Sequence, residues 1–134
     1  MSKAIIIVAL LATSIVPVAA TASAGKSSTS ISLVLFSAPA LGTSRPSFGD
    51  QVTFNVSTTA TDTPWVDARC YQGGTLVYEQ WAGFYAGYPA GQTFTLGPTQ
   101  MWTGGAANCT ARLVEWTSKG TDKTLASVGF NVAG

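Results

Sequence analysis

Histidine is absent from the 134-residue chain. Without it, Ser-His-Asp and Cys-His catalytic arrangements cannot be built, and zinc loses a principal ligand. Six Asp and Glu residues remain, but no spacing indicates a glycosidase-type carboxylate pair or a calcium-binding ladder. We therefore expect no catalytic residues, no metal site and no cofactor. A small hydrolase would have to depend on carboxylates such as Glu79 and Glu115, which lie on separate predicted strands.

Charge is also scarce, since only 10% of the residues are Asp, Glu, Lys or Arg. Leaving out Lys3, which belongs to the N-terminal segment, six basic residues face six acidic ones (7 − 1 = 6). Nucleic acids and anionic membranes attract clusters of Lys and Arg. The composition therefore predicts no nucleic-acid partner.

Long apolar runs are missing beyond residues 4–20. That run follows Lys3, ends before the small-x-small sequence Ala22-Ser23-Ala24, and is shorter than the roughly 20 residues that span a bilayer. It predicts a signal peptide over residues 1–24, cleaved after Ala24, in preference to a membrane anchor. We therefore expect a secreted, extracellular protein with no membrane span after cleavage.

The remaining chain divides into a short flexible lead-in and one domain. The lead-in covers residues 25–29, which are rich in Gly, Ser and Thr. The domain covers residues 30–134, a length typical of a single domain.

Cys70 and Cys109 are the only cysteines. Each lies midway along a strand-like run, and behind an export signal such a pair predicts one disulfide in a small extracellular domain. A redox-active pair is the alternative, but the chain has no CxxC spacing.

The domain shows alternating patterns and no helical periodicity. Turn residues separate seven runs, which predicts an all-β, Greek-key β-sandwich of about seven strands, with an open barrel as the alternative. The predicted strands cover residues 30–37, 50–59, 65–72, 75–81, 92–96, 108–116 and 124–132.

In strand number, strand order and aromatic placement, residues 30–133 resemble the immunoglobulin-like β-sandwich of secreted bacterial proteins. Trp65, on the third run, is similar to the core tryptophan of that family. The family disulfide joins the second and sixth strands, whereas these cysteines lie on the third and sixth runs. The resemblance implies that those two strands are neighbours, so the disulfide is expected to be cross-strand within one sheet.

This pairing specifies a register. With Cys70 opposite Cys109 in an antiparallel pair, the numbers of opposed residues sum to 179. Asp67 then faces Arg112 as an ion pair on the outer side, where Trp65 and Tyr71 also point. A one-residue slip would turn the charged pair toward the core. The cysteine side holds the apolar pairs Ala68 with Ala111 and Val66 with Leu113.

Aromatic residues crowd one connecting segment. We predict a candidate binding surface there, because exposed aromatic patches mark binding sites. A contact with a protein and a contact with a glycan are both open, and so is the alternative that Trp81, Phe84 and Tyr88 close the edge of the sandwich. The candidate residues are Trp81, Phe84, Tyr85, Tyr88 and, from a later loop, Trp102.

The functional expectation is a secreted, non-catalytic, immunoglobulin-like domain that makes extracellular binding or structural contacts. Its partner would be an extracellular protein or another cell-surface component. The alternative is a carbohydrate-binding module acting at a cell wall or polysaccharide through residues 81–88. A small extracellular hydrolase or hydrolase inhibitor is a third class.

Overall fold

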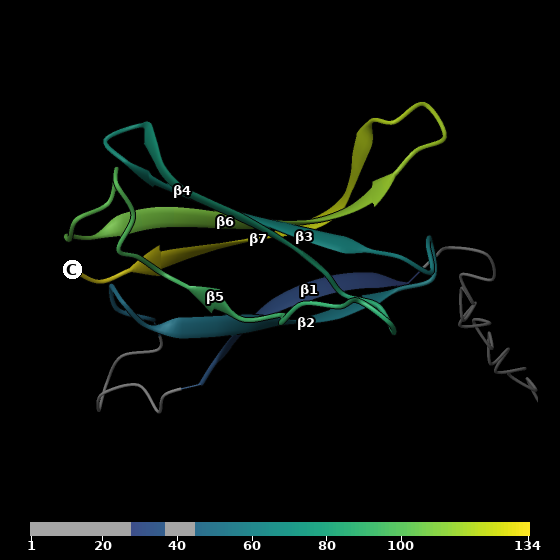
Figure 1. The fold of residues 1–134 in the computed structure, drawn as a ribbon, viewed down its shortest axis with the longest axis horizontal. Helices are drawn as coiled ribbons and strands as arrows, with labels where there is room; N and C mark the ends of the chain where they lie inside the picture. Colours follow the sequence, from purple (N-terminus) through teal and green to yellow (C-terminus); the bar gives the residue numbers. More distant parts are fainter. Residues whose placement is uncertain (1–27, 37–44) are drawn as a thin grey trace, which may run out of the picture.

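The computed structural model describes residues 28–36 and 45–134, which form an all-β open sandwich (Figure 1). The predicted signal peptide (1–24) and most of the lead-in lie outside the described residues. Among the described residues, no helix is long and apolar enough to span a bilayer. The strands are β1 (Thr29–Leu35), β2 (Gln51–Thr58), β3 (Trp65–Gln72), β4 (Thr75–Gly83), β5 (Phe94–Thr95), β6 (Ala107–Trp116) and β7 (Asp122–Val132).

The strands form two antiparallel sheets, in the orders β1-β2-β5 and β4-β3-β6-β7. The predicted all-β, seven-stranded fold is confirmed. All strand bounds agree with the prediction within two residues. The most shortened strand is β5, which is reduced to two residues, and β4 continues to Gly83.

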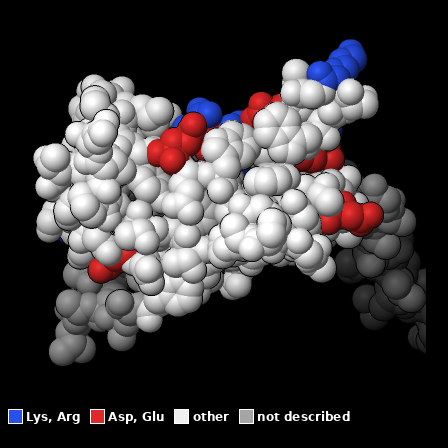
Figure 2. Space-filling view, in the orientation of Figure 1, with Lys and Arg blue, Asp and Glu red and all other residues white. Residues whose placement is uncertain are grey.

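The four-stranded sheet has an inner face toward the other sheet and an outer face toward solvent. Figure 1 shows the β3–β4 and β6–β7 turns rising at opposite ends, away from the three-stranded sheet. In the space-filling view, the surface dips into a shallow hollow between these two turns (Figure 2).

The core lies between the sheets and follows the predicted alternation. On β3 and β6, the residues that share the cysteine side are buried because they face the apolar side chains of β2 and β5. The buried set includes Val52, Phe54, Val66, Ala68, Phe94, Ala111 and Leu113.

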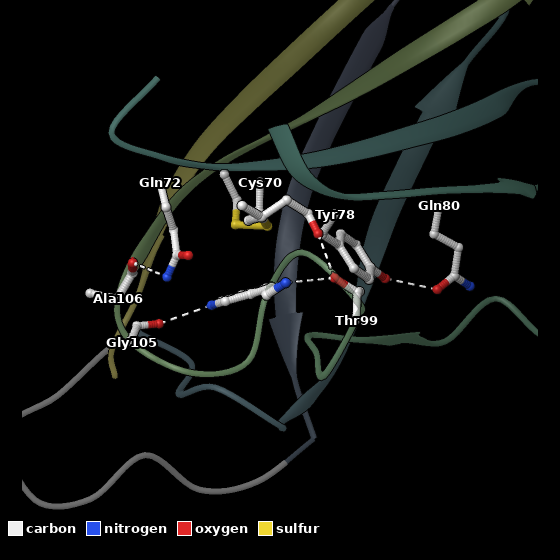
Figure 3. The surroundings of a disulfide bond; sticks show 10 residues. Cys70, Gln72, Tyr78, Gln80, Thr99, Gly105 and Ala106 are labelled. Atoms are coloured by element: carbon white, nitrogen blue, oxygen red, sulfur yellow. Dashed lines mark hydrogen bonds between the residues drawn. A yellow bond between two sulfur atoms is a disulfide. The ribbon is translucent and has the colours of Figure 1, made fainter. Parts of the chain in front are cut away.

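The Cys70–Cys109 disulfide joins neighbouring strands of one sheet, as predicted. The β3–β6 register pairs Cys70 with Cys109 directly, at a Cα–Cα distance of 4.0 Å. Both cysteines are buried. Figure 3 shows the disulfide beside Tyr78, whose hydroxyl lies 2.7 Å from Gln80 Oε1. The bond therefore holds β3 to β6 at the boundary between the sheet and the core.

Trp102 lies in this core, and its assignment to a binding surface was wrong. Its side chain is fully buried, with edge-to-face contacts to Phe48 and Tyr78. Its indole Nε1–H donates to the carbonyl of Gly105 at 3.0 Å, and its backbone N–H donates to Thr99 Oγ1 at 2.9 Å. An indole with a satisfied N–H fills core volume well, so Trp102 serves as packing.

Candidate functional site

Five aromatic side chains gather on the outer face of the four-stranded sheet. We call this set the outer aromatic face. The solvent side of an antiparallel sheet is usually polar, so an aromatic group there is a candidate ligand surface. Its members are Trp65, Trp81, Tyr85, Tyr88 and Trp116.

Trp81 and Trp116 form its most open part. Their rings stack at a centroid distance of 5.7 Å with 28° between the planes, although they come from β4 and β6. Trp116 is 51% exposed, and Trp81 is half-buried. Val114, which lies opposite Trp65 on the same face, is fully buried outside the core cluster between the sheets. An apolar layer therefore covers this part of the sheet on its solvent side.

Trp65, Tyr85 and Tyr88 form the second part. Their rings pack edge to face, with centroid distances of 5.9 Å for Trp65–Tyr85, 5.3 Å for Trp65–Tyr88 and 5.6 Å for Tyr85–Tyr88. The tyrosines reach this position because Gly83, opposite Trp65, has no side chain. A Cβ atom on Gly83 would overlap both tyrosine rings. Gly83 is therefore needed for this part of the face.

Phe84 lies on the other side of the chain. It stacks on the buried Phe94 at 6.3 Å and packs against the core. The predicted aromatic segment therefore divides. Phe84 and Tyr88 pack against the core, as the alternative proposed, although Tyr88 also contacts Trp65 and Tyr85. Trp81 and Tyr85 reach the outer aromatic face.

An ion-pair network lies beside and beneath Trp81. Arg112 Nη2 is 2.7 Å from Asp67 Oδ2, and Arg69 Nε is 3.0 Å from the same oxygen. Arg69 also pairs with Glu79, and Arg112 Nη1 is 3.0 Å from Asp122 Oδ2. In Figure 2, acidic and basic groups gather in the hollow between the two raised turns. The face thus combines aromatic rings with charged hydrogen-bonding groups.

Asp67 does not lie at the surface as expected. It pairs with Arg112 and lies on the outer side of the sheet, as predicted, but its exposed fraction is 0%. The reason is the cover above it. Trp81 is its neighbour on β4, and the guanidinium of Arg112 lies 5.9 Å from the centre of the Trp81 ring.

Burial also changes the electrostatics of this carboxyl. It raises the pKa of Asp67, while the hydrogen bond from Arg112 and the charge of Arg69 act in the opposite direction. The hydrogen bond to Asp67 in turn raises the pKa of Arg112. Asp67 Oδ1 and Arg112 Nε are buried without a hydrogen-bond partner. The network therefore contains a carboxylate whose burial is only partly compensated.

Other features lie away from this face. A shallow groove runs beside β4, between Leu76 and the exposed Met101, and another lies at the end of β2 beside Phe84. Within residues 28–36 and 45–134, no three His, Cys, Asp or Glu side chains are grouped closely enough to hold a metal ion.

Sequence reasoning missed Trp116 as a site residue. The β3–β6 register carries the signal that would have found it, because Trp116 shares the outer side of β6 with Arg112 and Val114. Comparisons with protein-family models, curated proteins and solved structures give no match to this chain.

Proposed function

We propose that the protein is a secreted, non-catalytic binding domain, and that its ligand face is the outer aromatic face. The observation that carries this proposal is the half-exposed Trp116 stacked on Trp81 on the solvent side of a sheet. Large exposed aromatic rings are uncommon on free surfaces and are enriched where a partner is bound.

The proposal includes an immunoglobulin-like fold family. The sheet orders β1-β2-β5 and β4-β3-β6-β7, with the third and sixth strands adjacent, support it. The buried disulfide and the predicted signal peptide over residues 1–24 support an extracellular location. The partner would then be a component of the cell surface.

Retention on cell envelopes tests the binding proposal. The protein would be purified in its exported form and incubated with washed envelopes of the producing organism. We expect retention that Trp116→Ala abolishes, whereas Phe36→Ala leaves it unchanged. Phe36 is a matched control because it is 58% exposed and follows β1, in the other sheet. Absence of retention, or equal retention of both variants, would contradict the proposal.

A further inference from the structure

We propose that the ligand of the outer aromatic face is a neutral polysaccharide chain. This inference rests on the proposed function and adds the chemical class of the ligand. Four features carry it: an oriented flat ring, polar groups at its border, the balance of charge, and a second aromatic group on the same face.

The oriented ring is that of Trp116. One side of its indole stacks on Trp81, while about half of its surface stays open to solvent. Because the stack on Trp81 orients the indole, less side-chain entropy is lost when a ligand covers it. The C–H face of a pyranose ring is flat and weakly positive, and it complements the negative face of an aromatic ring.

The polar groups are the outer members of the ion-pair network. Glu79 and Asp122 are about one-third exposed, at 34% for each side chain, and Arg69 is 37% exposed. An ion-paired carboxylate keeps free lone pairs that accept from hydroxyl groups, and a guanidinium has five N–H donors. Since the network holds these groups in position, they are placed to hydrogen-bond the equatorial hydroxyls of a stacked sugar.

The charge balance selects against anionic glycans. The network has three carboxylates, Asp67, Glu79 and Asp122, and two guanidiniums, those of Arg69 and Arg112. The sum is 2 − 3 = −1, so a polyanion meets no excess of positive charge. Each guanidinium is already paired within the network. A neutral chain meets no such electrostatic penalty.

The second aromatic group indicates a chain of several sugars. Trp65 precedes Asp67 by two positions on β3, and Asp67 is the cross-strand neighbour of Trp81. Two positions along a strand span about 7 Å, so the Trp65–Tyr85–Tyr88 group adjoins the Trp81–Trp116 stack. Two adjoining aromatic groups on one face provide contact area for more than one ring.

Affinity electrophoresis of the exported protein tests this inference. Native gels would contain hydroxyethylcellulose, laminarin, xylan, galactomannan or dextran as neutral probes, and alginate or heparin as polyanions. We expect at least one neutral polymer to retard the protein and neither polyanion to do so. Trp116→Ala should weaken retardation at least about tenfold, as loss of a central aromatic contact does. Trp116→Phe should restore part of it, and Phe36→Ala should have no effect.

The outcomes separate this inference from the proposed function. Envelope retention that depends on Trp116, with no retardation by any neutral polymer, would overturn the glycan class and leave the binding domain in place. Retardation by the polyanions alone would also overturn it. A Trp116-dependent dimer in sedimentation analysis would assign the face to a second copy of the chain. Unchanged near-ultraviolet circular dichroism of each variant would exclude misfolding as the cause of lost binding.

Discussion

At the scale of single residues, Asp67 determines how the outer face is organised. It is the one buried charged residue in the described part of the chain. Two guanidiniums contact one of its oxygens, and Trp81 lies beside it across the strand. Buried carboxylates persist in folded proteins when they are paired. Asp67 therefore couples the charged network to the aromatic residues that cover it.

Removing Arg112, which makes the shortest contact with Asp67, should be costly. We predict that Arg112→Met lowers the free energy of unfolding by about 3 kcal/mol, because Asp67 would remain buried with only Arg69 beside it. Arg69→Met is the matched control. It leaves the 2.7 Å contact with Arg112 in place, and loss of a more exposed pair costs below about 1 kcal/mol. Urea denaturation measures both, and equal costs would contradict a dominant role for Arg112.

At the scale of elements, the β3–β6 pair is the part of the fold whose register the sequence predicts most fully. Its register was predictable because the two cysteines fix one pairing and the neighbouring residues agree with it. Only one side of each strand suits the core, so alternation excluded the slipped register. The same reasoning placed Asp67 on the outer side correctly.

Burial on that outer side was not predictable in the same way. Asp67 is covered by side chains from β4 and β6, and alternation along β3 carries no information about what neighbouring strands place above it. Trp102 was wrongly predicted to lie at the surface for a related reason. It lies in a loop, where no alternation of apolar and polar residues indicates which side chains are buried. Its burial depends on Phe48 and Tyr78, which are distant in the sequence.

The disulfide should contribute a large share of the stability of this element pair. It closes a separation of 39 residues, for which the chain-entropy relation gives about 4 kcal/mol. We predict that the double variant Cys70→Ala/Cys109→Ala loses about this amount in urea denaturation. Reducing the disulfide of the unmodified protein should lower the urea concentration at the unfolding midpoint by about as much as the double substitution does. A loss below about 1 kcal/mol, or free thiols in the exported protein, would contradict this role.

At the scale of the whole molecule, the four-stranded sheet has an apolar inner surface and an outer surface that combines aromatic rings with ion pairs. The inner one is closed by the other sheet and by Trp102, which is fully buried. The outer one is partly exposed to solvent. Its aromatic residues belong to β3, β4, β6 and the segment after β4. We attribute stability to the first surface and binding to the second.

Two tryptophan variants should separate these roles. Trp102→Ala leaves a core cavity and should cost about 3–5 kcal/mol. Trp116→Ala removes a half-exposed ring with one stacking partner and should cost about 1 kcal/mol or less. Thermal or urea unfolding measures the difference. Similar costs for the two variants would contradict the division.

The most direct test of the ligand face is a titration followed through the four tryptophan indole N–H signals in nitrogen-proton correlation spectra. The probe would be an oligosaccharide cut from the neutral polysaccharide that retards the protein most strongly. We predict that the signals of Trp116 and Trp81 shift in proportion to saturation, while the signal of Trp102 stays fixed as an internal control. Saturable binding that leaves Trp116 and Trp81 unmoved would contradict the assignment of the ligand to the outer aromatic face.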